Sequence, residues 1–138
     1  MYPEEIVKPC RAQLTENGFE SLETAESVEN FMKESGSDTA LLVVNSVCGC
    51  AAGSARPGVL KSLTGNITPA RLATVFAGVD TEATQTAREF MLPYPPSSPS
   101  IALFKNGKLV HFVERHMIEG RPADMIAEHL KACYEQFC

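Results

Sequence analysis

The stretch that decides the fold is ALLVVNSVCGCAAG, residues 40–53. Its first half is an unbroken apolar run, which is typical of a strand buried on both faces in the middle of a parallel sheet. Its second half can continue as a helix, so Cys48 and Cys50 fall at a strand-to-helix junction. A helix N-terminus offers unpaired N–H groups and a partial positive charge, which stabilise a thiolate and lower its pKa. The stretch therefore predicts that Cys48 is a nucleophile for thiol–disulfide exchange.

The size and composition of the chain predict one globular domain spanning residues 1–138. The net charge is −5 and no Lys/Arg cluster occurs, which argues against a nucleic-acid partner. No apolar stretch approaches the roughly 18 residues of a membrane span, which argues against a membrane partner. The N-terminus has neither the basic nor the apolar region of a signal peptide. These features predict a cytoplasmic protein.

Periodicity and breakers divide the chain into helices and strands. Helical signals mark residues 3–17, the segment from Thr24 to a break at 36–38, the segment after Cys50, the segment from Asp80 or Thr81 to Pro93, and the segment from Pro122 onward. Strand signals mark residues 40–45, 72–77, 101–104 and 109–113, the last two joined by the hairpin signal Asn106-Gly107. The first and last helices are expected to bury stripes that include Ile6 and Met125, and Pro57 is expected to kink the helix after Cys50.

The predicted order is two helices followed by β-α-β-α-β-β-α. We expect an α/β protein with a thioredoxin-like fold, a central mixed β-sheet flanked by helices, and an N-terminal helical extension. Two landmarks agree with this fold: the cysteine pair follows the first core strand, and Ser98-Pro99 precedes the third, where such proteins carry a cis-proline. We therefore predict a cis Ser98–Pro99 bond, although only about 5–6% of X–Pro bonds are cis. The backbone of Ser98 is then expected to pair with an extended substrate.

Residues 43–53, with Ala55-Arg56-Pro57 following, resemble the active-site segment of the bacilliredoxins. These are thioredoxin-like proteins with a Cys-Gly-Cys motif, linked to the low-molecular-weight thiol bacillithiol. Residues 75–78, 96–100 and 110–120 are similar to that family, and Cys138 also fits. The resemblance implies a thiol–disulfide oxidoreductase that removes bacillithiol from S-bacillithiolated cytosolic proteins, with no bound cofactor and bacillithiol as thiol co-substrate.

The same resemblance implies roles for the two thiols. Cys48 attacks the mixed disulfide and takes the bacillithiol, and Cys50 or a second bacillithiol resolves the adduct. We expect four residues to contact the substrate: Gly49, Ser98, Pro99 and His116. Gly49 is also expected to help the short Cys-x-Cys disulfide ring close, because glycine tolerates backbone angles closed to other residues, and His116 is expected to lie near the rim of the site. Arg56 is interpreted as a surface or helix-packing residue, or as a ligand for a carboxylate-bearing thiol.

The remaining cysteines and histidines give weaker signals. Five cysteines, an odd number, do not suggest a disulfide scaffold. Structural or surface positions are expected for Cys10, Cys133, Cys138, His111 and His129. A zinc site needs four ligands as a rule, and these residues show no spacing typical of ligands, so no metal is predicted. Two alternative functions stay open: a general protein thiol–disulfide isomerase, and a non-catalytic metal-binding or redox-sensing protein.

Overall fold

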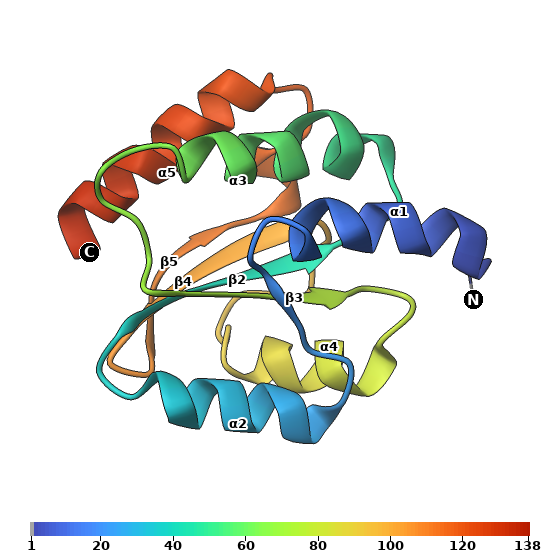
Figure 1. The fold of residues 1–138 in the computed structure, drawn as a ribbon, viewed down its shortest axis with the longest axis horizontal. Helices are drawn as coiled ribbons and strands as arrows, with labels where there is room; N and C mark the ends of the chain where they lie inside the picture. Colours follow the sequence, from blue (N-terminus) through green and yellow to red (C-terminus); the bar gives the residue numbers. More distant parts are fainter. Residues whose placement is uncertain (1) are drawn as a thin grey trace.

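The computed structural model describes residues 2–138, which form a mixed five-stranded sheet with helices on both faces (Figure 1). The elements are, in order, α1 (Glu4–Thr15), β1 (Glu20–Ser21), α2 (Ala25–Ser35), β2 (Thr39–Asn45), the π-helix η1 (Ala51–Ala55), α3 (Arg56–Ser62), β3 (Arg71–Phe76), α4 (Thr81–Glu89), β4 (Ser100–Lys105), β5 (Lys108–Val113), the 3₁₀-helix η2 (Arg115–Met117) and α5 (Ala123–Phe137). Helices α1, α3 and α5 lie on one face of the sheet, and α2 and α4 cover the other. The predicted α/β architecture is therefore confirmed.

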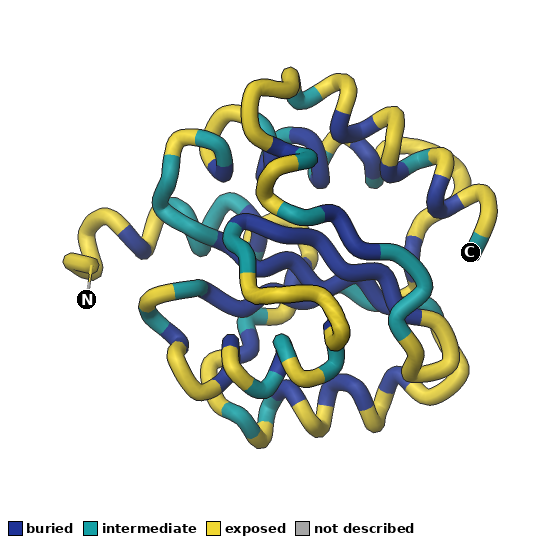
Figure 2. Tube along the Cα trace, turned by 180° about the vertical axis from the view of Figure 1, so that it is seen from behind, coloured by how far each residue is buried: buried dark blue, intermediate teal, exposed yellow. Residues whose placement is uncertain are grey.

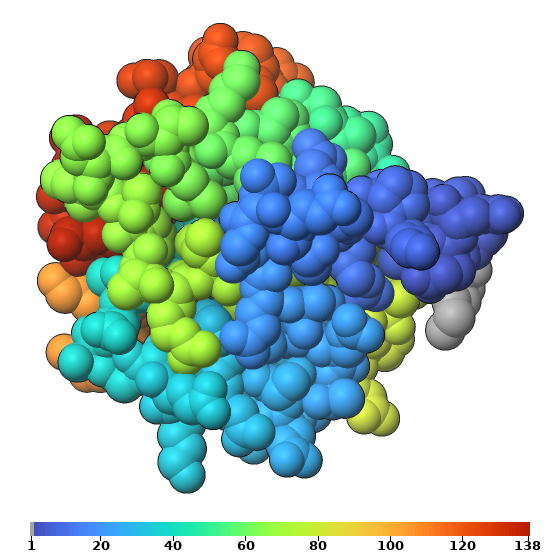
Figure 3. Space-filling view, in the orientation of Figure 1, coloured from blue at the N-terminus to red at the C-terminus, as the bar shows by residue number. Residues whose placement is uncertain are grey.

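The strand order is β1-β3-β2-β4-β5, with β3 parallel to both β1 and β2 and with antiparallel β2–β4 and β4–β5 pairs. The N-terminal extension contains both expected helices, α1 and α2, together with a short strand, β1, that was not predicted. A two-residue strand carries no periodicity that a sequence could reveal. In the space-filling view, the blue N-terminal segment packs between the green α3 region and the light-blue α2 region, over this side of the molecule (Figure 3).

The core lies on both faces of β2, as the apolar run predicts. Leu42 and Val44 pack with the residues of α2 and α4, whereas Leu41 and Val43 pack with those of α3 and α5. Figure 2 shows the central strands as the most continuously buried part of the trace. Each fully buried Leu or Val contributes about 1.5–3 kcal/mol through removal of apolar surface from water. This rigid strand holds the segment that follows it in place.

Two predicted core residues lie outside the core. Ile6 is 48% exposed and Met125 is 52% exposed. In each helix the next residue, Val7 or Ile126, is buried instead. Because successive helical residues are rotated by about 100°, a residue next to a buried one can fall outside the stripe that faces the core. The sequence left that choice open, and packing against the sheet decides it.

Helices α3 and α5 approach each other closely at Gly58, so we expect Gly58→Ala to destabilise the fold. A Cβ atom added at Gly58 would lie 2.6 Å from the Cβ of Ile126 and 3.1 Å from the Ala123 carbonyl oxygen. Overpacking of this kind costs about 1–3 kcal/mol, more than the gain of about 1 kcal/mol from replacing glycine by alanine in a helix. Urea denaturation measures the change in unfolding free energy. Gly53→Ala is the control, since its Cβ would meet no atom within 4 Å; equal effects of the two substitutions would contradict the prediction.

Candidate active site

The Cys48-Gly49-Cys50 motif lies at the junction between the end of β2 and the start of a helix, as predicted. Strand β2 ends at Asn45, and the carbonyl oxygen of Cys48 accepts hydrogen bonds from the N–H groups of Ala51 and Ala52, at 3.1 and 3.2 Å. Cys48 is thus the first residue of a helical segment that continues through η1 into α3. The irregularity expected at Pro57 takes the form of the π-helix η1, which directly precedes the turn containing this proline, a residue that has no N–H to donate.

The two thiols are in direct contact and differ in acidity. Their Sγ atoms lie 2.7 Å apart, and both cysteines are free and half-buried. Burial raises the pKa of Cys48, but hydrogen bonds from the Cys50 thiol, the Ser46 hydroxyl and two backbone N–H groups outweigh it, so the net pKa is lowered. Burial, the hydrogen bond to Cys48 and the charge of Cys48 raise the pKa of Cys50. The arrangement favours a thiolate at Cys48 beside a protonated Cys50.

Alkylation should report this difference directly. Since the pKa of Cys48 is lowered, its reaction with iodoacetamide should fall to half its maximal rate only at a pH below the ordinary thiol value of about 8.5. Removing the hydroxyl in Ser46→Ala should move that midpoint to higher pH. Fragmentation of the singly labelled peptide by mass spectrometry assigns the label to Cys48 or Cys50. The control is Ser54→Ala, which removes a hydroxyl that donates to the Arg121 carbonyl and not to Cys48. This substitution should leave the midpoint unchanged. Preferential labelling of Cys50 would contradict the prediction.

Gly49 has an ordinary backbone conformation in this dithiol state. Its φ angle is not among the positive values that favour glycine, and an added Cβ would meet no atom within 4 Å. The two thiols are free here, so the role of Gly49 in closing a Cys48–Cys50 disulfide stays a prediction. Gly49 is exposed, and the absence of a side chain leaves the approach to both sulfur atoms open.

Arg56 stabilises the loop before Cys48 through hydrogen bonds to Asn45 and Ser46. The residue is only 3% exposed, so of the two expected positions the surface one is wrong and the helix-packing one is confirmed. Its guanidinium donates to the Asn45 side-chain oxygen at 2.9 Å, the Ser46 carbonyl at 2.7 Å and Gln13 of α1 at 2.7 Å. These bonds and the burial engage the guanidinium within the protein, so the alternative of binding a substrate carboxylate gains no support. The Asn45 side chain in turn receives the Ser46 N–H, at 2.8 Å.

The loop that contains Ser98 and Pro99 (the proline loop) lies at the same end of the sheet as the cysteine motif. The Ser98–Pro99 bond is cis, which confirms the prediction, and Leu92–Pro93 is a second cis bond that the sequence did not reveal. The antiparallel register places Ser100 beside Val44, so Pro99 lies next to the end of β2 from which the cysteine loop leaves. Pro99 is buried, and the carbonyl of Ser98 accepts a hydrogen bond from Arg115 at 3.2 Å. That carbonyl is therefore paired with Arg115, and pairing of the Ser98 backbone with an extended substrate stays a prediction.

Arg115 is the site residue that sequence reasoning missed. Its backbone N–H donates to the Ser97 hydroxyl, and its side chain bonds Glu119 as well as the Ser98 carbonyl. The hydrogen bond to Glu119 and the charges of both thiols raise the pKa of Arg115. The exposed guanidinium thus bonds the proline loop and interacts with the thiol pair through its charge. The sequence offered one signal for Arg115: it lies four residues before Glu119, within the segment 110–120 that resembles the bacilliredoxins.

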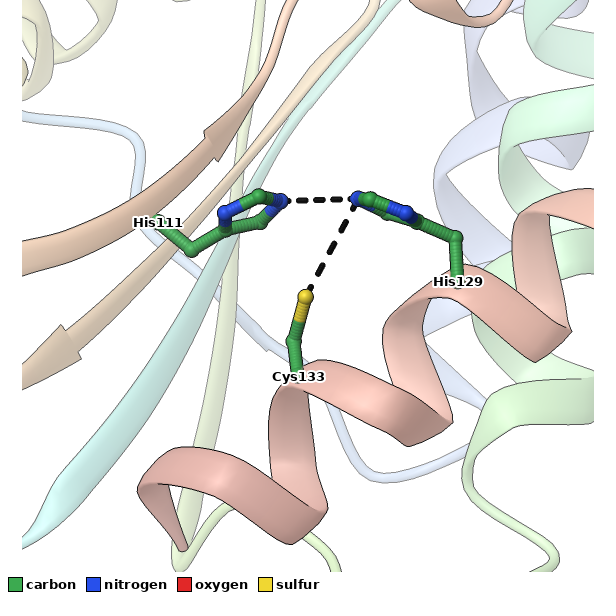
Figure 4. Close-up of side chains that lie close together, drawn as sticks. All are labelled: His111, His129 and Cys133. Atoms are coloured by element: carbon green, nitrogen blue, oxygen red, sulfur yellow. Dashed lines mark hydrogen bonds between the residues drawn. The ribbon is translucent and has the colours of Figure 1, made fainter.

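The predicted site residue His116 follows Arg115 in η2. It is exposed, and its Nδ1 lies 3.8 Å from the Glu114 carboxylate, so its contact with substrate stays a prediction. The remaining cysteines follow the predictions in part: Cys133 is buried, Cys10 half-buried and Cys138 exposed. The structure also gathers His111, His129 and Cys133, which the sequence separates, into one cluster on α5 and β5 (Figure 4). The sequence indicated only part of this cluster, because His129 and Cys133 are four residues apart, about one turn of a helix.

Comparison with known proteins gives this geometry its context. A family model described as "Disulphide isomerase" matches residues 2–138. A protein named Bacilliredoxin from Cytophaga hutchinsonii is 64% identical and covers 99% of both chains. Another Bacilliredoxin, from Halalkalibacterium halodurans, is 50% identical and covers 99% of this chain and 94% of its own.

Solved structures agree on the fold. The thioredoxin of Fasciola hepatica has a TM-score of 0.59 at 16% identity, covering 87% of this chain and all of its own. A thioredoxin f2, solved in complex with ferredoxin:thioredoxin reductase, has a TM-score of 0.60 at 16% identity, covering 86% and 94%. These values confirm the thioredoxin fold.

Among residues 2–138, none of the helices combines the length and hydrophobicity that crossing a membrane requires. The sequence relatives and the family model point to the same thiol–disulfide chemistry. The chain belongs to the bacilliredoxin family, and it is a thiol–disulfide oxidoreductase.

Proposed function

We propose that the protein removes bacillithiol from mixed disulfides on cytoplasmic proteins, with Cys48 as the attacking thiol and Cys50 as the resolving thiol. The observation that carries this proposal is the contact between two thiols of opposite pKa shift, 2.7 Å apart, next to an exposed guanidinium. Bacillithiol carries a malate group, whose carboxylates an arginine can bind. The name shared by the sequence relatives supports the same substrate.

In the first step the Cys48 thiolate attacks the bacillithiol sulfur of the mixed disulfide. A new disulfide forms between Cys48 and bacillithiol, the original disulfide breaks, and the target protein leaves as a thiolate that takes a proton from solvent. The exposed Gly49 leaves room for this approach. We assign the surface of Gly49, Ser98 and Pro99 to contact with the target protein, with His116 at its edge.

In the second step Cys50 or a second bacillithiol resolves the adduct. Once the Cys48 sulfur is in a disulfide, it no longer carries the charge that raises the pKa of Cys50. Cys50 therefore becomes more acidic at the stage when it must attack. Its attack on the Cys48 sulfur releases bacillithiol as the thiolate and leaves a Cys48–Cys50 disulfide, which external thiols reduce. Attack by free bacillithiol on the bound bacillithiol sulfur instead releases bacillithiol disulfide and returns the Cys48 thiolate.

Arg115 should contribute to recognition of the bacillithiol carboxylates. We expect Arg115→Gln to raise the KM for a bacillithiolated protein by about tenfold, because a charged, bidentate partner is lost, with a smaller decrease in kcat. The effect should shrink for the same protein modified with cysteamine, which has no carboxylate. Steady-state kinetics on both substrates, with Arg121→Gln as control, separate this role from a general effect on the thiols. An equal loss on the two substrates would exclude carboxylate recognition.

The proposal is tested by offering the reduced protein two substrates in parallel. One is a bacillithiolated protein, followed by intact mass, and the other is scrambled ribonuclease, followed by regained activity. Removal of bacillithiol at least ten times faster than reshuffling supports the proposal. The family model's description favours a second candidate, a general disulfide isomerase; equal or faster reshuffling would establish that alternative and overturn the first.

A further inference from the structure

We propose that His111, His129 and Cys133 bind a single divalent transition-metal ion of the zinc type. The three side chains converge from two elements, His111 from β5 and the other two from α5 (Figure 4). The cluster is separate from the thiol pair, because the register aligns His111 with Leu103 and Leu103 with Leu41, four residues before the end of β2. The proposal does not depend on the function assigned to Cys48 and Cys50.

The geometry of the cluster suits one ion. The Nε2 atoms of His111 and His129 lie 2.8 Å apart, the Cys133 Sγ lies 3.9 Å from the His129 Nε2, and all three ligand atoms lie within 4.8 Å of one another. A point near the centre of such a triangle lies within about 2.5 Å of each atom, close to Zn–N and Zn–S bond lengths of about 2.0–2.3 Å. Only small side-chain rotations are then needed to form three bonds.

The chemistry of the ligands also selects the ion. Two imidazoles and one thiolate form a borderline-soft set that suits Zn²⁺ and excludes Mg²⁺ or Ca²⁺, which prefer oxygen. The ion replaces the hydrogen bond between the two rings, and Cys133 releases its proton to solvent when the Zn–S bond forms. Three protein ligands leave one position of a tetrahedral site for water.

Access and exposure are consistent with ion entry. His129 is exposed, His111 is half-buried and Cys133 is buried, so the cluster opens to solvent on one side only. His129 also borders a hollow of about 240 Å³ whose other walls include Met117, Arg121 and Met125. A bound ion would join β5 to α5 in place of the His111–His129 hydrogen bond that now links them beside their apolar packing, and it would shield the Cys133 thiol.

The test uses full-length protein with Cys10, Cys48, Cys50 and Cys138 replaced by serine, so that no thiol other than Cys133 can bind the probe. Competition with a chromophoric chelator should show one Zn²⁺ per chain, and Zn²⁺ should raise Tm, since it binds the folded state only. His129→Ala in this background should weaken binding by at least about tenfold, because even outer-shell partners of a metal ligand are worth that much. His116→Ala is the matched control and should bind Zn²⁺ normally.

Cobalt provides a second, spectroscopic readout. Co²⁺ in the same site should give a thiolate-to-cobalt charge-transfer band that disappears in Cys133→Ser. Circular dichroism and the metal-free Tm establish that each variant is folded, and the exposed position of His129 keeps the test valid even if Cys133→Ser unfolds. Absence of Zn²⁺ binding, equal weakening by His129→Ala and His116→Ala, or a cobalt spectrum without the thiolate band would each overturn the proposal.

Discussion

Replacing Cys48 by alanine is expected to abolish transfer of bacillithiol from a modified protein, with a loss of at least about 1,000-fold. Cys48 is the only one of the two thiols whose pKa is lowered, and the thiolate is the species that attacks a disulfide. The remaining Cys50 keeps a pKa raised by burial and lies inside the first helical turn. Intact mass of the target protein measures the transfer.

Cys50→Ala distinguishes attack from resolution. This variant keeps the attacking thiol and loses the internal resolving thiol, so a bacillithiol adduct should accumulate on Cys48. Its rate of formation should fall moderately, because the Cys50 thiol no longer donates the hydrogen bond that lowers the pKa of Cys48. Excess bacillithiol should clear the adduct. If the adduct instead forms on Cys50 in the Cys48→Ala protein at an undiminished rate, the two roles are reversed.

The parts of the fold that could be predicted are those encoded by local pattern. The apolar run before Cys48 predicts a buried strand, and the Asn106-Gly107 turn predicts the β4–β5 hairpin, because each depends on residues adjacent in sequence. The cis bond at Pro99 could be predicted from its place in the element order alone. The thiol pair could be placed at the start of a helix for the same reason.

The parts that could not be predicted are long-range contacts between polar side chains. Arg56 follows the motif closely and has an apolar helix around it, so nothing in its neighbourhood reveals that its partners include Gln13 on α1. Arg115 joins the site only because the sheet brings the end of β5 next to the proline loop. His111 and His129 meet only because α5 packs against β5. In each of these contacts the chain must already be folded before the partner can be identified.

Replacing Arg56 by methionine is expected to lower the unfolding free energy by about 2–4 kcal/mol and to make Cys48 less acidic. Methionine fills similar space but cannot donate a hydrogen bond. The Ser46 carbonyl, which accepts one from the buried Arg56 guanidinium, therefore loses its partner. A buried group left unpaired costs about 1–3 kcal/mol, and hydrogen bonds to charged groups contribute about 1.5–3 kcal/mol. Release of the guanidinium from its buried position offsets only part of this loss. Urea denaturation and the pH midpoint of Cys48 alkylation measure the two effects.

Arg11→Met is the matched control for this prediction. It removes another arginine, one that bonds Ser21 and Asp80 and makes no hydrogen bond to the loop before Cys48. Arg11 forms an ion pair with Asp80 at 2.8 Å, and Asp80 is only 8% exposed. That substitution should therefore also destabilise the protein, yet it should leave the alkylation midpoint of Cys48 where it is in the unmodified chain. Of the two arginines, only Arg56 bonds the Ser46 loop, whose hydroxyl lowers the pKa of Cys48. Equal shifts of the midpoint in both variants, or no shift in Arg56→Met, would show that the anchor supports the fold without tuning the nucleophile.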